Sequence, residues 1–158
     1  MRRDPALQDL SRDHHAILIL AQHLRKAADG PEAHEAALRH LRGHIPPLLL
    51  HFQEEESLVF PNLAPQASAH YVSDHEALRK DLARLALEGT LPAERLVSIG
   101  EEIRDHIRRE EAAFDGLQRV LGPRQVAALG DHLLQFRRRH RPQAIGAGTC
   151  DFPPLSPA

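Results

Sequence analysis

Glycine and proline divide this 158-residue sequence into a few long segments, and their spacing limits the possible folds more than any other feature. Between the breaks, alanine, leucine, arginine and glutamate predominate and β-branched residues are few. No segment alternates apolar and polar residues as a half-buried strand would. The breaks therefore predict helices from near residues 9–11 to 29, and over 32–60, 70–87, 93–121 and 124–140, with a loop over 62–69.

Four helices of about 18 to 28 residues joined by short loops favour an antiparallel up-down four-helix bundle. The shorter fifth helix would pack across one end or along one side. Pro46 and Pro47 lie inside the second predicted helix, so we expect a kink or a break between Gly43 and Pro47. The prediction is an all-α protein in which residues 1–141 form the bundle and its additional C-terminal helix. Residues 142–158, rich in proline, form a flexible tail.

Composition excludes several classes of protein. No apolar run approaches the roughly 18 residues that cross a bilayer, and the N-terminus lacks the apolar core of a secretory signal. Cys150 is the sole cysteine, which excludes a disulfide framework, a cysteine-based zinc site and an iron–sulfur cluster within one chain. The net charge of −2 gives no general attraction to nucleic acid. We therefore expect a cytoplasmic protein with neither a membrane nor a nucleic-acid partner.

An internal repeat carries the histidines that suggest a function. Asp13-His14 in the first predicted helix matches Asp74-His75 in the third. The segments starting at His51 and His106 both read His-apolar-x-x-Glu-Glu. The first two helices therefore resemble the third and fourth, as in a duplicated helical hairpin.

The spacing within this repeat brings imidazole and carboxylate groups together. His51 and Glu55, like His106 and Glu110, are four residues apart and share one face of a helix. His14 and His75 lie on the apolar stripes of their own helices and should point inward. Charges in an apolar core are costly unless they are paired or bind metal. Six such ligands suit two ions with bridging glutamates, a donor set that fits iron, zinc, copper or manganese.

The ordered set of His14, His51, Glu55, His75, His106 and Glu110, with Phe60-Pro61 closing the second helix, resembles the hemerythrin-like (HHE cation-binding) domain over about residues 7 to 120. The resemblance implies a four-helix bundle with a non-haem di-iron site. It makes the four histidines terminal ligands and the two glutamates bridges between two iron ions, joined by an oxo or hydroxo group. Zinc or manganese is the alternative metal.

Two departures from oxygen-carrying hemerythrins affect the expected chemistry. Arg79 stands where those proteins have a further histidine, and Glu110 rather than an aspartate one residue later supplies the fourth-helix carboxylate. The set resembles the four-histidine, two-glutamate branch of the family, which is linked to iron binding, oxygen or nitric oxide sensing, and repair of iron centres. With open metal positions, we expect O2, NO or peroxide to react at the metal rather than be carried reversibly. The sequence assigns no enzymatic activity.

Other interpretations concern the neighbouring residues. His15 competes with His14, and His44 and His70 are weaker candidate ligands. Glu54, Glu56 and Glu111 are expected at a solvated edge, and Glu54 is the one that could serve as a partner of a ligand. Asp13 and Asp74 are expected to be charges at helix N-termini or acceptors for a neighbouring imidazole. The basic run Arg137–Arg141 is interpreted as favourable charge at a helix C-terminus. The alternative is contact with an acidic partner or with nucleic acid, although no interleaved aromatic residues support nucleic-acid binding. The rival to a di-iron protein is a structural or interaction bundle in which metal only supports the fold or is absent.

Overall fold

A computed structural model describes residues 4–140 of the chain, and within that range it is all-α, as predicted. The elements are α1 (Pro5–Arg25), α2 (Pro31–Glu54), a π-helical turn η1 (Glu55–Val59), a 3₁₀ turn η2 (Phe60–Asn62), α3 (Pro65–Glu88), α4 (Ala93–Val120) and α5 (Pro123–Arg139). The predicted tail at 142–158, with Cys150, lies outside the described residues.

The helix ends show where the sequence interpretation was wrong. α1 begins at Pro5 rather than near Asp9, and α3 begins at Pro65, inside the predicted loop. Proline fits the first turn of a helix because its φ is already helical and its missing N–H has no acceptor there. α3 ends at Gly89, whose φ of 73° is left-handed and suits a residue without Cβ.

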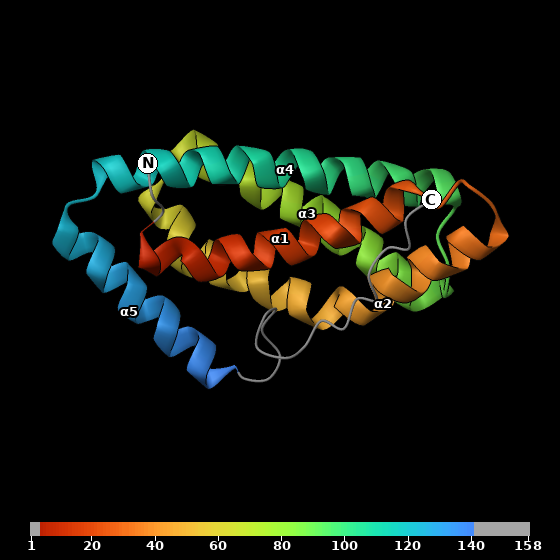
Figure 1. Cartoon of the computed structure of the whole chain (residues 1–158), viewed down its shortest axis with the longest axis horizontal. Helices are drawn as coiled ribbons and strands as arrows, with labels where there is room; N and C mark the ends of the chain where they lie inside the picture. The colour runs from red at the N-terminus through yellow and green to blue at the C-terminus, as the bar shows by residue number, and fades with distance from the viewer. Residues whose placement is uncertain (1–3, 141–158) are drawn as a thin grey trace.

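Of the two outcomes expected at the proline pair in α2, a kink or a break, the break is absent. α2 stays helical through Pro46 and Pro47. Neither proline can donate to the carbonyl group four residues earlier, and the α2 ribbon curves along its length (Figure 1).

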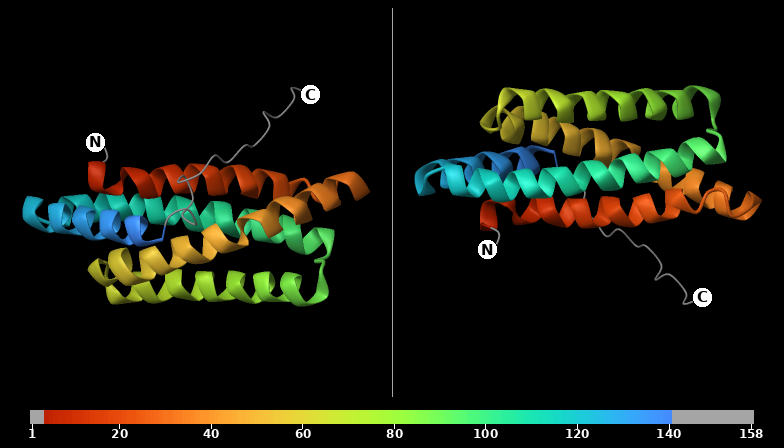
Figure 2. Two further views of the ribbon diagram at one scale, coloured as in Figure 1. Left: turned by 90° about the horizontal axis from the view of Figure 1, so that it is seen from below. Right: turned by 90° about the horizontal axis from the view of Figure 1, so that it is seen from above.

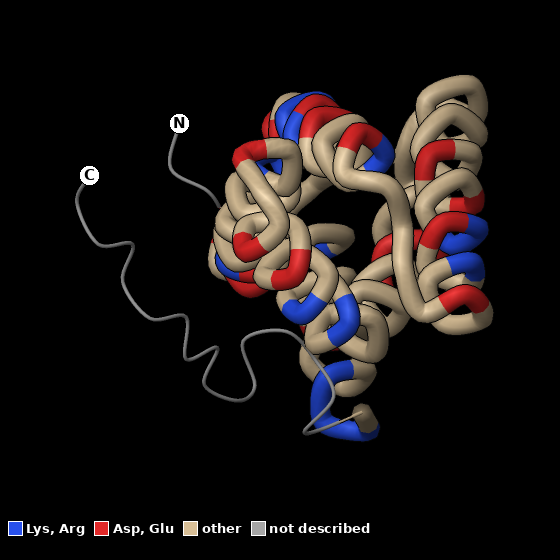
Figure 3. Tube along the Cα trace, turned by 90° about the vertical axis from the view of Figure 1, so that its right-hand side faces the viewer, with Lys and Arg blue, Asp and Glu red and all other residues tan. Residues whose placement is uncertain are grey.

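The first four helices lie along the long axis of the molecule, and consecutive helices run in opposite directions (Figures 1 and 2). α1 packs most extensively against α4 and also contacts α2 and α5, while α3 contacts α2 and α4. α5 folds back from the end of α4 and lies against α1 and η1. Viewed from one end, acidic and basic positions are interspersed over the helices (Figure 3).

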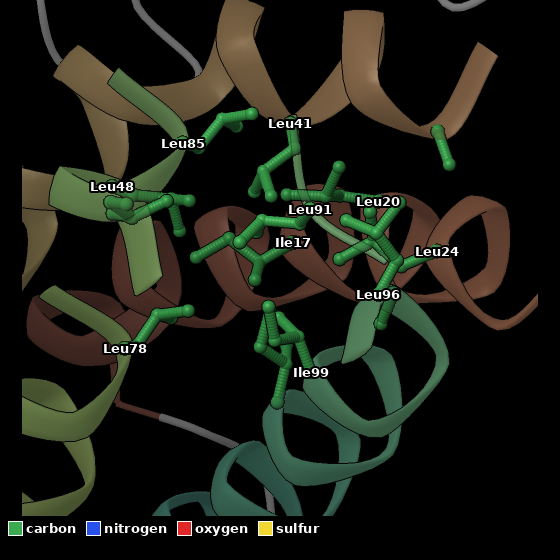
Figure 4. Packing of buried hydrophobic residues seen from close by; sticks show 14 of the residues in the cluster. Ile17, Leu20, Leu24, Leu41, Leu48, Leu78, Leu85, Leu91, Leu96 and Ile99 are labelled. Carbon is green, nitrogen blue, oxygen red and sulfur yellow. The ribbon is translucent and has the colours of Figure 1, made fainter. Parts of the chain in front are cut away.

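The apolar core consists of two clusters, and the repeated histidines lie between them. The larger cluster includes Ile17, Leu48, Leu78 and Ile99, one from each of the first four helices (Figure 4). The smaller cluster, which α5 helps to close, comprises Leu7, Leu10, Val59, Phe60, Tyr71, Phe114, Leu117, Leu129 and Leu133. Along each of the first four helices, a buried histidine falls between residues of the two clusters, so the fold contains one polar layer.

A close approach of α1 and α4 gives a first prediction. A Cβ at Gly100 would lie 2.7 Å from the backbone oxygen of Ala21, which cannot move independently of α1. We expect Gly100→Ala to destabilise the protein by about 1–3 kcal/mol in chemical denaturation, despite alanine's higher helix propensity. Gly116→Ala in the same helix is the control, since nothing lies within 4 Å of the added Cβ. That variant should gain up to about 1 kcal/mol; equal effects at the two sites would contradict the close approach.

A histidine cluster between α1 and α2 gives a second prediction. The His23 and His40 rings stack with centroids 4.1 Å apart. Burial, together with neighbouring Lys26, Arg39 and His44, lowers the pKa of both rings below 6.5. The unfolded chain therefore takes up these protons first, and this part of the stability is present above pH 6.5 and lost as the pH falls below it.

Urea denaturation at about pH 7 and pH 5 tests this contribution. The double variant His23→Gln/His40→Gln should lose less stability on acidification than the original chain. His15→Gln/His132→Gln, at exposed positions, is the matched control and should lose as much stability between the two pH values as the original chain. If the stability of His23→Gln/His40→Gln depends on pH as that of the original chain does, these two histidines do not contribute to the loss of stability in acid.

No helix within residues 4–140 has both the length and the apolar character needed to cross a membrane.

Candidate metal centre

All six predicted site residues lie in the buried polar layer. Their exposed fractions range from 0% for Glu55 to 8% for His106. Four helices supply the imidazoles: His14 from α1, His51 from α2, His75 from α3 and His106 from α4. Glu55 is the first residue of η1, and Glu110 follows His106 on α4.

The six residues form two groups of three. In each group, one nitrogen or oxygen per residue lies within 4.8 Å of the others, close enough for all three to bind one cation. The first group is His14, His51 and Glu55, and the second is His75, His106 and Glu110. The sequence predicted that the six residues would meet around two ions and that each histidine would lie near the glutamate four residues later, but it did not divide the six into these two groups.

In the first group, Glu55 Oε1 lies between two imidazoles. It is 3.0 Å from His14 Nε2 and 3.3 Å from His51 Nε2. In the second group the central atom is His106 Nε2, which lies 3.0 Å from Glu110 Oε1 and 3.0 Å from His75 Nε2, while Glu110 Oε1 lies 3.9 Å from His75 Nε2. In all four histidines, the Nε2 atom is the one directed at the shared centre.

Each glutamate also reaches the other group through its second oxygen. Glu55 Oε2 lies 3.6 Å from His75 Nε2, and Glu110 Oε2 lies 3.4 Å from His14 Nε2. Glu55 Oε2 and Glu110 Oε1 are buried and accept no hydrogen bond of good geometry. A buried carboxylate oxygen without a hydrogen bond costs free energy that a cation would offset. Each carboxylate therefore has one oxygen near the imidazoles of each group.

The Nδ1 atoms of the four histidines face four further carboxylates, a feature that the sequence analysis largely missed. His14 Nδ1 pairs with Glu111 at 2.6 Å and His75 Nδ1 with Glu56 at 2.9 Å. His106 Nδ1 pairs with Asp74 at 2.8 Å, and His51 Nδ1 lies 3.6 Å from Asp13. A carboxylate on Nδ1 fixes the ring orientation and leaves Nε2 as the ligand atom.

The pairing follows the internal repeat. Asp13, next to His14, faces His51, and its repeat partner Asp74, next to His75, faces His106. In the same way, Glu56 and Glu111, which follow Glu55 and Glu110, each reach across to a histidine of the other hairpin. Asp74 accepts from the imidazole of His106 on a neighbouring helix, not from the adjacent His75, and Asp13 lies 3.6 Å from His51 Nδ1, beyond hydrogen-bond distance.

Arginine side chains bind three of these four carboxylates, and a serine donates to the fourth. Arg79 binds both oxygens of Glu56 at 2.8 and 3.1 Å, and Arg109 binds Asp74 at 2.7 Å. Ser11 donates to Glu111 at 3.0 Å. Arg79 thus supports His75 through Glu56.

The third arginine, Arg137, lies where the sequence analysis did not expect it, and so does its partner Glu54. Its guanidinium lies 2.6 Å from Asp13 and 2.7 Å from both oxygens of Glu54. Glu54 is therefore buried beneath α5, not at a solvated edge. Arg137 turns inward to neutralise two buried carboxylates, so the interpretation as helix-terminal charge was wrong for this residue. The sequence offered no signal that α5 would cover this side of the centre.

The charges of the polar layer depend on one another. Burial opposes a charge on His14, but Glu111, Glu55 and Glu110 outweigh it and raise the His14 pKa to about 10. Burial also opposes a charge on Glu55, yet the nearby His51, His14 and His75 lower the Glu55 pKa to about 2. Burial and the neighbouring His106 lower the pKa of His75 to about 4, and burial and Glu55 raise that of Glu110.

The competing ligand candidates lie elsewhere. His15 is exposed on α1 and points away from the layer that contains His14. His44 directs Nδ1 to the carbonyl of His40 in its own helix. The His70 side chain is 58% exposed and lies 3.8 Å from Asp74. None of the three belongs to either group.

Three consecutive glutamates at the end of α2 and the start of η1 have three different partners. Glu54 points to Arg137 on α5, Glu55 into the centre and Glu56 to His75 on α3. The helix changes to π geometry at Glu55 and to 3₁₀ geometry at Phe60 before it ends. Such turns are frequent at functional sites.

The all-helical fold with its buried histidine and carboxylate groups defines a cation-binding helical protein. The sequence matches the hemerythrin HHE cation-binding domain over residues 6–115, and the chain belongs to this family. No curated protein and no solved structure matches the chain.

Proposed function

We propose that the chain is a di-iron protein that binds or reacts with O2, NO or peroxide. Its scaffold would be the antiparallel up-down four-helix bundle of the family, with α5 added along one side. His14, His51 and Glu55 would hold one ion and His75, His106 and Glu110 the other, with both glutamates shared. The observation that carries the proposal is the geometry of Glu55 and Glu110, each of which has one oxygen directed at each group.

The donor set supports iron among the divalent metals. Imidazole nitrogen and carboxylate oxygen suit iron, manganese and zinc, and shared carboxylates are typical of di-iron centres in helical bundles. With two imidazoles and two shared carboxylate oxygens, each six-coordinate ion would keep about two positions for other ligands. Iron there would supply redox chemistry and affinity for diatomic ligands.

The chain's own residues would orient and protect the site. Glu111, Asp13, Glu56 and Asp74 hold the imidazoles with Nε2 inward. Phe52 stacks on the His75 ring with centroids 4.0 Å apart, and Phe114 stacks on His14 at 5.5 Å. These rings limit water around the ligands, which favours selective reaction with small uncharged molecules.

Elemental analysis of protein purified without added metal tests the proposal. We expect about two iron ions per chain, and an absorption spectrum that changes between air and NO. The double variants His14→Ala/His51→Ala and His75→Ala/His106→Ala should each keep about one ion, because each removes two ligands of a single group. His15→Ala/His132→Ala, at exposed positions, is the matched control and should keep both.

Three results would count against the proposal. Zinc in place of iron, or no metal with unchanged melting, would favour a structural or interaction bundle. Full metal content in both histidine double variants would remove the residue assignment. A stable, reversible complex with O2 would contradict reaction at the metal in favour of transport.

A further inference from the structure

A cavity of about 360 Å³ leads from the surface between α3 and α4 to the six-residue centre. Its inner end is lined by His51, Glu55, His75, His106 and Glu110. Its walls are mainly apolar, and they include Ile17, Leu48, Leu78 and Ile99 from four different helices. In Figure 4, Leu78 points from α3 toward Ile17 and Ile99. At the outer end lies the exposed Ala77.

This cavity is far larger than a diatomic ligand needs. A water-sized molecule requires about 10–15 Å³ of such space, and O2 and NO are of similar size. The volume falls instead in the range of about 300–1,000 Å³ that is typical of sites for organic molecules. Such sites are mostly apolar with a few polar groups, which matches the walls and inner end of this cavity.

The charged residues at the rim are already paired with one another. Arg95 binds Asp81 at 2.5 Å and Glu102 at 2.8 Å. Arg109 binds Asp74 at 2.7 Å, and Asp105 lies 3.0 Å from Arg104. An ionic ligand would have to compete with these pairs, whereas an uncharged molecule would pass between them and bury apolar surface against the walls.

We propose that this cavity binds an uncharged organic molecule with an apolar body, held against the metal centre. This inference deepens the proposed function, since it adds a second ligand class to the same site. Binding itself rests on the cavity walls, and the proximity to metal rests on the proposed function.

Fluorobenzene is a suitable probe because it is small, uncharged and visible by ¹⁹F NMR. The full chain, as purified, should broaden the fluorobenzene signal in a saturable manner, and the charged analogue 4-fluorobenzoate should bind at least about tenfold more weakly. Ala77→Trp, which fills the outer end, should weaken fluorobenzene binding by about tenfold or more. Ala83→Trp is the matched control, since Ala83 is exposed on α3 and does not line the cavity.

A smaller substitution, Ala77→Met, keeps the test valid if tryptophan disturbs folding, and it should weaken binding to a lesser degree. No saturable binding to the original chain, equal binding of fluorobenzoate, or equal binding by the Ala77 and Ala83 variants would overturn the proposal.

A second measurement separates this inference from the metal assignment. Protein loaded with paramagnetic Mn²⁺ should enhance the relaxation of bound fluorobenzene relative to Zn²⁺-loaded protein. Saturable binding without any metal uptake would support the cavity and refute the metal centre. Metal uptake without probe binding would support the metal centre and refute binding in the cavity. Probe binding without relaxation enhancement would place the probe away from the centre and overturn the proposal.

Discussion

Arg137→Ala is expected to lower the free energy of unfolding by about 3–5 kcal/mol, because it removes the cation from two buried carboxylates. The side chains of Asp13 and Glu54 are each 3% exposed, and Arg137 lies within 2.7 Å of both. For a chain of this size, the loss corresponds to a fall in melting temperature of about 10 °C or more. Thermal and chemical denaturation of the purified variant measure it.

Two controls identify the cause of that loss. Arg138→Ala removes the same side chain from an exposed neighbouring position and should change stability by less than about 0.5 kcal/mol. Adding Asp13→Asn and Glu54→Gln to Arg137→Ala removes the unpaired charges, so it should recover part of the stability. If Arg137→Ala melts at the same temperature as the original chain, Arg137 does not stabilise the protein by neutralising these carboxylates.

Metal removal is expected to have a still larger effect. A ligand that binds only the native state stabilises it by about 4 kcal/mol when its free concentration is a thousand times its Kd. Two ions would contribute about 8 kcal/mol, or a melting temperature higher by about 20 °C. Differential scanning calorimetry before and after treatment with a chelator, and again after iron is restored, measures the difference.

The histidine double variants provide the comparison for this experiment. His14→Ala/His51→Ala should show about half of the metal-dependent increase in melting temperature, because the second group is intact. The exposed-site control His15→Ala/His132→Ala should show all of it. A melting temperature that does not respond to chelator or to iron would contradict ion binding in the polar layer.

The helical class could be predicted from the sequence, and so could the two pairs of neighbouring histidine and glutamate, because both depend on local spacing. Histidine and glutamate four residues apart share a helix face in any fold. Asp13 and Asp74 occupy matching positions in the repeat, but each faces a histidine on another helix. Helical periodicity within one segment does not specify which helices are neighbours.

What the sequence did not predict depends on tertiary contacts. The inward turn of Arg137 requires α5 to lie against α1 and η1, and no pattern in residues 124–140 specifies that position. The continuity of α2 through its prolines has a related cause. Propensity opposes proline in the interior of α2, but packing of Leu41 and Leu48 on either side keeps the helix intact.

The repeat produces two groups of equivalent composition, but α5 makes their surroundings different. Asp13, which faces His51, is buried beneath Arg137. Asp74, which faces His106, is bound instead by the more exposed Arg109 beside the cavity mouth. His14 does not line that cavity, and every residue of the second group does. We therefore expect unequal ions: the one held by His75, His106 and Glu110 would exchange quickly and meet incoming molecules first. Its counterpart would remain as a slowly exchanging anchor, so that a protein built by duplication would work with one active and one supporting half.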